Sequence, residues 1–128
     1  MTPEELLELA DGARRNAYAP YSRCRVGAAL LCADGAVYTG CNIENAAFGP
    51  TVCAERTAFF KAISEGKRDF SAIAIVGGDD SAPFPPCGVC RQVMGEFCSG
   101  DFRVHLRGVT LTLEELLPHR FGAESFSL

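Results

Sequence analysis

The sequence predicts a single α/β domain in which helices pack on a layered β-sheet. Helix-forming and strand-forming stretches alternate along the chain, and this order is typical of the α/β class. The 128 residues suffice for one compact core that buries about two thirds of the surface of the unfolded chain. The sequence has no internal repeat, linker or low-complexity tract, so we expect one catalytic domain over residues 1–128.

The first expected element is a helix over residues 3–16. Thr2 can cap its N-terminus, Pro3 is favoured at the first helical position, and Glu5 completes the pattern of a capping box. The spacing of the apolar residues that follow predicts an amphipathic helix. These residues are Leu6, Leu9, Ala10, Ala13 and Ala17.

Strands are expected in four places. Two β-rich runs, residues 26–32 and 37–39, flank the turn sequence Ala33-Asp34-Gly35 and predict a hairpin. Apolar runs later in the chain predict two more strands, and a stretch rich in glycine and proline predicts a loop between them. These are a strand over 71–76, a loop over 77–85 and a strand over 102–106.

Two further helices are expected over residues 54–65 and 88–97, each directly after a cysteine. Gly66 is suited to a left-handed cap at the end of the first of them. A last short helix is expected where Thr112 and Glu115 form another capping pattern.

Three cysteines form the most informative pattern in the chain. Cys87 and Cys90 stand three positions apart, a spacing at which one helical turn can direct two sulfur atoms to one ion, and Cys53 lies upstream. Thiolates are stabilised at helix N-termini by the partial positive charge and free N–H groups there. A structural zinc site has four protein ligands, whereas a hydrolytic site has three and an open position. Three thiols without an obvious fourth ligand therefore predict a catalytic Zn²⁺ site.

Glu55 and Arg56 stand next to this pattern. Two residues after Cys53, the Glu55 carboxylate can lie near the ion without binding it, where a general base is needed. Acidic residues are also common in the first turn of a helix for electrostatic reasons alone. Three thiolates leave Zn²⁺ with a surplus negative charge, which a hydrogen bond from Arg56 to sulfur would offset. The alternative for Arg56 is a solvated helix arginine.

Composition favours a small enzyme of a reducing compartment, and we expect a cytoplasmic location. The seven cysteines are an odd number and the N-terminal residues are polar and acidic, so a disulfide framework is not expected. Nowhere do eighteen apolar residues run together, so no membrane partner is expected. The cysteines outside the zinc pattern are expected to be buried small apolar residues. They are Cys24, Cys32, Cys41 and Cys98.

The Cys53-x-Glu55 pair with Pro86-Cys87-x-x-Cys90 resembles the signature of zinc nucleobase deaminases. Over nearly its whole length the chain is similar to the small tetrameric cytidine deaminases. The matching blocks are Tyr21-Ser22, Val26 to Leu30, Gly40 to Ala46, Cys53 to Ala58, Pro86 to Val93 and Glu115 to Pro118. The resemblance implies a three-layer α-β-α sandwich around a mixed, roughly five-stranded sheet. It also implies one Zn²⁺ per subunit, a homotetramer, and hydrolysis of cytidine and 2′-deoxycytidine to the uridines and ammonia in pyrimidine salvage.

The resemblance also assigns substrate-binding residues. It implies that Asn42 and Glu44 bind the ribose 3′-hydroxyl, that the Ala54 N–H holds the base O2 carbonyl, and that the Pro85 carbonyl accepts a hydrogen bond from the substrate amine. Phe121 stands where relatives send a phenylalanine into a neighbouring active site to stack on the base. The plainer alternatives are turn chemistry for Asn42 and Glu44, and packing of Phe121 on its own subunit.

Two departures from the family pattern concern this site. Cys24 stands where relatives usually carry phenylalanine, which removes an aromatic face from the pyrimidine pocket. A stacked ring contributes on the order of 1 kcal/mol, so we expect either weaker cytidine binding or room for a bulkier base. Pro85, the second departure, replaces a serine but keeps its carbonyl.

Phe48 is not a departure: it stands at a position usually held by tyrosine or another aromatic residue near the subunit junction.

The net charge of −4 argues against a nucleic-acid partner, because polymer binding draws on phosphate neutralisation by basic side chains. A free nucleoside is therefore the expected substrate. A local basic rim made by Arg14, Arg15, Arg23 and Arg25 across a subunit boundary remains open. Two alternative functions also remain: deamination of a modified or larger cytosine nucleoside, as in blasticidin deaminases, and a non-catalytic zinc-stabilised nucleoside-binding module.

Overall fold

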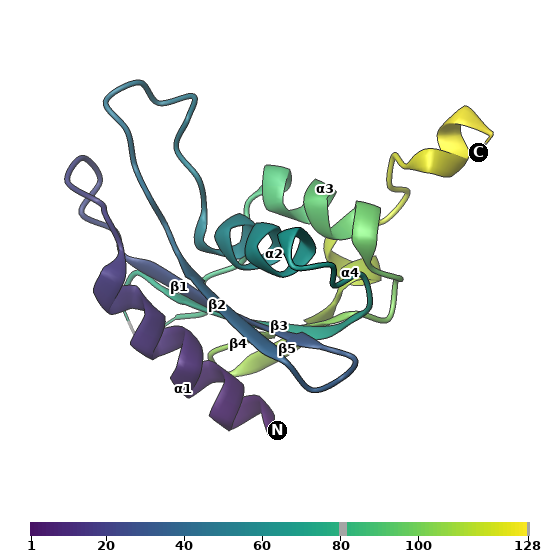
Figure 1. Cartoon of the computed structure of the whole chain (residues 1–128), viewed down its shortest axis with the longest axis horizontal. Helices are drawn as coiled ribbons and strands as arrows, with labels where there is room; N and C mark the ends of the chain where they lie inside the picture. The colour runs from purple at the N-terminus through teal and green to yellow at the C-terminus, as the bar shows by residue number, and fades with distance from the viewer. Residues whose placement is uncertain (80–81, 128) are drawn as a thin grey trace.

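The computed structural model describes residues 1–79 and 82–127. Their strands form one sheet in the order β2-β1-β3-β4-β5, with helices on both faces (Figure 1). The β3–β4 pair is parallel and the other neighbours are antiparallel, so the predicted mixed α/β sandwich is confirmed. The strands are β1 (Val26–Cys32), β2 (Val37–Cys41), β3 (Phe70–Gly77), β4 (Arg103–Leu106) and β5 (Val109–Thr112).

One face of the sheet is covered by α1 (Pro3–Ala13). The Thr2 hydroxyl accepts a hydrogen bond from the Glu5 N–H at 3.1 Å, which caps the helix as predicted. A 3₁₀ turn over Arg14–Asn16 follows, so the helical segment ends where the sequence predicts. Leu6 and Ala10 of α1 are buried against small side chains of the sheet. Because these side chains are short, the helix can approach the sheet closely. These sheet residues are Ala29, Ala72, Ala74 and Val76.

The opposite face carries α2 (Ala54–Ser64) and α3 (Gly88–Phe97), close to the predicted ranges. Gly66 ends α2 with φ +93°, the left-handed cap expected there. The main core lies between these helices and the sheet, with Phe59 packed edge-on against Phe70 at a ring separation of 5.1 Å. Each large side chain buried there stabilises the fold by roughly 1.5–3 kcal/mol. Its largest fully buried members are Phe59, Leu30, Ile73, Ile75, Met94, Val104 and Leu113.

The chain ends with α4 (Leu113–Leu116) and a short tail. The Glu115 N–H donates to the Thr112 hydroxyl and the Thr112 N–H donates to the Glu115 carboxylate, which is the predicted capping box. The tail continues into a 3₁₀ turn at Ala123–Phe126 and projects away from the sheet (Figure 1). No helix in residues 1–79 and 82–127 is long and apolar enough to cross a membrane.

Three sequence expectations need correction or completion. The run over residues 102–106 predicts one strand, but a second one, β5, follows the turn at Gly108 and forms a short sheet edge. The loop predicted over 77–85 begins one residue later, and its residues 80–81 lie outside the described part of the chain. Of the four cysteines expected to be buried, only Cys32 is. The half-buried ones occupy a loop at Cys24, the end of edge strand β2 at Cys41 and the C-cap of α3 at Cys98.

Gly40 brings α2 against β2. A Cβ atom at Gly40 would lie 2.5 Å from the Ala54 carbonyl oxygen and 2.6 Å from the Ala58 nitrogen, both backbone atoms. We expect Gly40→Ala to lower the free energy of unfolding by at least about 2 kcal/mol through overpacking. The matched control is Gly12→Ala in α1, where nothing lies within 4 Å and stability rises by about 0.5–1 kcal/mol. Chemical denaturation checks both, and equal effects would contradict the close approach.

Candidate metal centre and substrate cavity

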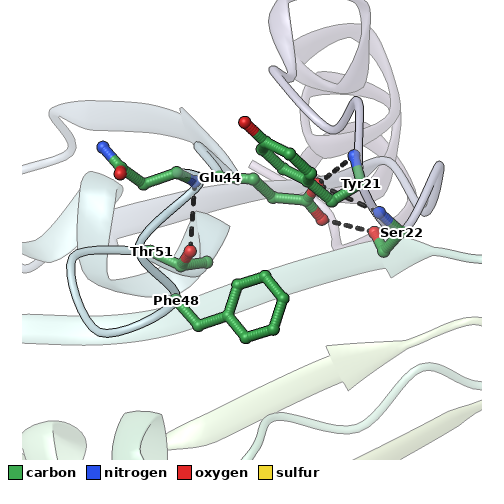
Figure 2. A pocket seen from close by; sticks show the side chains of 6 residues that line it. Tyr21, Ser22, Glu44, Phe48 and Thr51 are labelled. Atoms are coloured by element: carbon green, nitrogen blue, oxygen red, sulfur yellow. Dashed lines mark hydrogen bonds between the residues drawn. The ribbon is translucent and has the colours of Figure 1, made fainter.

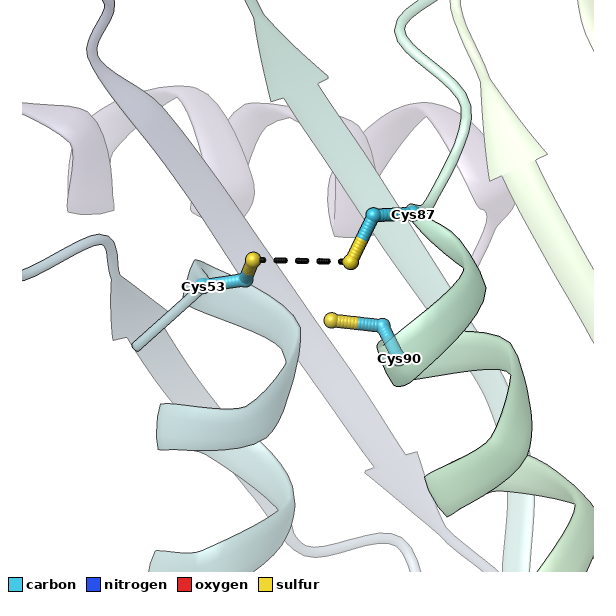
Figure 3. A group of neighbouring side chains, drawn as sticks. All are labelled: Cys53, Cys87 and Cys90. Atoms are coloured by element: carbon cyan, nitrogen blue, oxygen red, sulfur yellow. Dashed lines mark hydrogen bonds between the residues drawn. The ribbon is translucent and has the colours of Figure 1, made fainter. Parts of the chain in front are cut away.

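The N-terminal ends of α2 and α3 bring the three cysteines together. Cys53 and Cys87 are the N-cap residues of these helices, both with extended backbone, and Cys90 lies in the first turn of α3. Figure 3 shows the three sulfur atoms directed toward one another between the helix ends. The sulfur atoms all lie within 4.8 Å of one another, and those of Cys53 and Cys87 are 3.7 Å apart.

These distances fit a bound zinc ion. Zn–S bonds of about 2.3 Å in tetrahedral geometry separate two sulfur atoms by about 3.8 Å, close to the 3.7 Å between Cys53 and Cys87. All three residues are free thiols. Within the described residues this is the one group of three or more metal-ligating side chains that meets these distances. The site therefore offers the predicted three sulfur ligands from this chain.

The sulfur cluster is electrostatically prepared for a cation. Hydrogen bonding with Cys90 lowers the pKa of Cys53, and the Arg56 guanidinium lowers it further. The Arg56 Nη2 atom donates to the Cys53 sulfur at 3.3 Å, the contact that the sequence predicts for this arginine. The same hydrogen bond to Cys53, together with burial, raises the pKa of Cys90. Thiols lose their protons when they bind a metal ion, so binding of an ion by this cluster releases protons.

Glu55 is a buried carboxyl group beside the cluster. It lies in the first turn of α2 and is only 3 % exposed. Burial raises its pKa to about 7, because a charged carboxylate is poorly solvated there. A carboxyl group that titrates near neutral pH can both accept and donate a proton. Glu55 therefore has the protonation behaviour of a general acid–base residue.

Most of the predicted site residues share one cavity of about 320 Å³. The metal-cluster cysteines Cys53 and Cys87 meet Glu55 at its wall. Its volume lies within the range of small-molecule sites. The sequence analysis did not identify Phe84, which lies two residues before the Pro86-Cys87-x-x-Cys90 motif and is not part of it. The lining residues are Ser22, Cys24, Val26, Asn42, Glu44, Thr51, Val52, Cys53, Ala54, Glu55, Phe84, Pro85 and Cys87.

Asn42 and Glu44 also brace the neighbouring loop. The Asn42 side chain accepts from the Val26 N–H at 2.9 Å and donates to the Cys24 carbonyl at 2.7 Å. The Glu44 carboxylate accepts from the N–H groups of Tyr21 and Ser22 and from the Ser22 hydroxyl, as Figure 2 shows. The hydrogen bond from Ser22 keeps the pKa of Glu44 below its usual range. The turn chemistry weighed for these two residues is therefore present.

A second cavity of about 340 Å³ adjoins the first and shares Ser22, Glu44 and Thr51 with it. Phe48, which is 78 % exposed, lies at its wall in the loop between β2 and α2 (Figure 2). This loop protrudes from the body of the molecule (Figure 1). The exposed ring and the open wall leave this side of the site uncovered within one chain.

Two groups named from the sequence lie outside the cavity that holds Glu55. Phe121 is 60 % exposed, packs edge-on against Phe126 with ring centroids 5.4 Å apart, and its carbonyl accepts from the Gln92 side chain. Of the four arginines considered as a basic rim, three line a separate surface cavity with Asp11. They are Arg14, Arg15 and Arg25.

Comparisons with known proteins agree with this geometry. The family model described as "Cytidine and deoxycytidylate deaminase zinc-binding region" matches residues 1–106. The chain is 53% identical to the cytidine deaminase of Halalkalibacterium halodurans, with 99% of each chain covered. It is 51% identical to that of Sporosarcina psychrophila, covering 99% of this chain and 96% of the relative. The crystal structure of cytidine deaminase from Burkholderia pseudomallei is similar with a TM-score of 0.90 at 48% identity, covering 94% and 100% of the two chains.

Proposed function

The chain belongs to the family of cytidine and deoxycytidylate deaminases, and from this premise we propose its reaction and the residues that perform it. It is a zinc-dependent hydrolase that converts free cytidine to uridine with release of ammonia, and 2′-deoxycytidine is its second substrate. The observation that carries this proposal is the arrangement of three thiols and a buried carboxyl group around one nucleoside-sized cavity.

The proposed metal ligands are Cys53, Cys87 and Cys90, with Zn²⁺ as the cofactor, one per chain. When bound, zinc supplies the Lewis acidity that makes water a nucleophile at neutral pH. Arg56 hydrogen-bonds to the Cys53 sulfur and offsets part of the thiolate charge, which would otherwise weaken that acidity.

Glu55 moves the protons of the reaction. As general base it accepts a proton from the attacking water, and it then donates this proton to N3 of the cytosine ring. Protonation at N3 makes C4 more electrophilic, so the water oxygen adds there. Glu55 carries the second water proton to the departing amine, which leaves as ammonia. The pKa of about 7 supports this two-way role, because neither protonation state is strongly disfavoured at neutral pH.

Backbone and side-chain groups of the same cavity hold the nucleoside. The Ala54 N–H at the start of α2 binds the base O2, and the Pro85 carbonyl accepts from the amine that leaves. Asn42 and Glu44 bind the ribose 3′-hydroxyl, supported by their place in the cavity wall. Their existing hydrogen bonds hold them in position, and an amide and a carboxylate each retain further bonding capacity.

The two alternative functions are less well supported. A non-catalytic binding module has no use for Glu55, a buried carboxyl group beside a metal cluster whose burial costs stability. A deaminase of bulky cytosine nucleosides would use the same metal cluster, but the names of the two relatives with 51% and 53% identity favour cytidine. The free thiols of all seven cysteines support a reducing compartment, and we assign the enzyme to the cytoplasm.

A substrate panel tests the proposed function. The zinc-loaded protein is assayed by loss of cytosine absorbance with cytidine, 2′-deoxycytidine, cytidine monophosphate and a single-stranded oligonucleotide. We expect turnover of both nucleosides, and at least about tenfold lower kcat/KM for the monophosphate, since the acidic chain disfavours a phosphate. Turnover of the oligonucleotide but not of cytidine would contradict the proposal.

We further propose a homotetramer in which Phe121 of one subunit completes the active site of another. The projecting tail supports this, since it leaves the rings of Phe121 and Phe126 exposed. The open wall beside Phe48 supports it as well, because a small domain has difficulty covering a polar cavity alone. Other large apolar side chains are exposed on the protruding segments near this wall: Tyr18, Tyr21 and Ile43.

Mixed oligomers test the composite site. Phe121→Ala should weaken cytidine binding about tenfold without loss of zinc, because base stacking is lost. Mixing Phe121→Ala subunits with Glu55→Gln subunits should restore part of the activity, since some sites then take the carboxylate from one chain and the ring from another. In the control mixture, Phe121→Ala subunits are combined with subunits that carry both substitutions and therefore supply neither group. A fully active monomer by light scattering, or equal activity in both mixtures, would contradict the composite site.

A further inference from the structure

We propose that Phe84 is the aromatic wall of the base pocket and that, with the short Cys24, it determines which cytosine nucleosides enter. This inference rests on the proposed deaminase function and adds to it a specificity-determining residue. It also assigns the class of substrate that the cavity admits: cytidine and cytosine nucleosides with a small additional substituent on the pyrimidine ring.

Phe84 is the aromatic residue of the cavity that holds Glu55. Among the described residues at this cavity wall it alone carries an aromatic ring, and the others are small, aliphatic or polar. A pyrimidine base has two flat faces, which are poorly solvated and stack favourably on aromatic side chains. Within one chain, Phe84 is therefore the group that can bind a face of the base.

A short and rigid segment of backbone connects Phe84 to the metal cluster. Pro85 and Pro86 are the two residues between Phe84 and the metal ligand Cys87, and proline fixes its own φ angle. The Pro86 carbonyl accepts a hydrogen bond from Arg91 Nε at 2.9 Å. A connection this short and rigid loses little conformational freedom when a substrate binds.

The ring of Phe84 packs against Gly77 and Gly78 at the end of β3. A Cβ atom at Gly77 would lie 2.9 Å from Cδ1 and Cγ of Phe84, and one at Gly78 would lie 3.3 Å from Cδ2. The same Cβ atom at Gly77 would lie 3.0 Å from the Cγ2 atom of Val26. The ring is half-buried by this packing while it still lines the cavity. A side chain larger than hydrogen at residue 77 must displace the ring.

Cys24 leaves room in the same cavity. Its backbone is held by hydrogen bonds from the Cys24 N–H to the Ser22 hydroxyl and from Asn42 to the Cys24 carbonyl. Its short side chain is half-buried at the cavity wall. A larger side chain at this fixed position would fill part of the cavity of about 320 Å³. The space that Cys24 leaves is where a ring substituent of the substrate fits.

Replacement of Phe84 tests its contact with the base. In zinc-loaded protein, Phe84→Leu should raise the KM for cytidine and the inhibition constant of the product uridine, each about fivefold, with unchanged zinc content. Phe84→Tyr keeps the ring and should restore values close to those of the wild type. A purely structural role would lower the melting temperature and leave uridine binding unchanged, and that result would overturn the inference. Wild-type turnover of cytidine tests the proposed function separately, so the two failures are distinguishable.

A double-mutant cycle tests the packing of the Phe84 ring against Gly77. Gly77→Ala should raise the KM for cytidine in the wild-type background, because its Cβ displaces Phe84. It should raise KM much less in the Phe84→Leu background, because a smaller, flexible side chain can move aside. Equal effects in both backgrounds would show that Gly77 acts independently of Phe84 and would overturn this step.

The substrate class is tested with 5-methylcytidine. Wild-type protein should deaminate it with a kcat/KM within about tenfold of that for cytidine, since the space beside the short Cys24 side chain accommodates one extra methyl group. Cys24→Phe should lower the KM for cytidine severalfold and reduce the relative kcat/KM for 5-methylcytidine at least about tenfold. An unchanged ratio of the two substrates in Cys24→Phe would overturn the assignment of Cys24.

Discussion

Replacing Glu55 by glutamine abolishes cytidine turnover while the protein keeps one zinc ion per chain. The amide has nearly the same shape as the carboxyl group but cannot accept and return a proton. General acid–base catalysis contributes typically about 10²–10⁴-fold, and Glu55 acts on two protons in succession. We therefore expect kcat to fall by at least about 10⁴-fold. Kinetics together with metal analysis on the same preparation check this result.

The matched control is Glu65→Gln at the other end of the same helix. Glu65 is exposed, caps the C-terminal end of α2 and accepts a hydrogen bond from the Tyr38 hydroxyl. Its replacement should leave kcat within about twofold of the wild type, since surface substitutions have small effects. Glu55→Gln with more than a tenth of wild-type turnover would remove the proposed role of this residue.

Replacing Cys53, Cys87 or Cys90 by alanine should remove zinc and activity together. Each variant leaves only two of the three sulfur ligands, and two protein ligands rarely suffice to hold Zn²⁺. Because bound metal stabilises only the folded state, we also expect the melting temperature to fall by at least about 5 °C. Metal analysis, a cytidine assay and thermal denaturation of each variant measure the three effects.

Cys41→Ala is the control for these three variants. Cys41 ends β2, is half-buried and lies outside the sulfur cluster. It should keep zinc and turnover. A cluster variant that retains a full equivalent of zinc would show that the ion has a different set of ligands.

The metal centre could be predicted from the sequence because its determinants are local. Cys53 and Cys87 each cap a helix start, and Cys90 follows one turn later, so short-range spacing fixes the direction of each sulfur. What brings the two helix ends together is the sheet beneath them, and the predicted α/β order supplied it. Likewise, the Thr2 cap of α1 and the Thr112–Glu115 capping box depend on neighbours within one turn.

Features that depend on distant contacts were harder to predict. Phe84 lies in a proline-rich loop, and only the approach of Gly77 and Gly78 shows that its ring is held at the cavity. The strand β5 is four residues long and half-exposed, too short for a periodic pattern to distinguish it from a loop. The half-buried positions of Cys24, Cys41 and Cys98 follow from their places in a loop or at the end of an element, whereas the prediction used the average behaviour of cysteine.

The most direct test of the account is a zinc titration of metal-free protein with cytidine turnover as the readout. The three-sulfur cluster predicts that activity is absent without metal, rises in proportion to added Zn²⁺ and reaches its plateau at one ion per chain. Product analysis at the plateau should show one uridine and one ammonia formed for each cytidine consumed. Cytidine deamination by fully metal-free protein, or a zinc-saturated protein that leaves cytidine unchanged, would contradict the account.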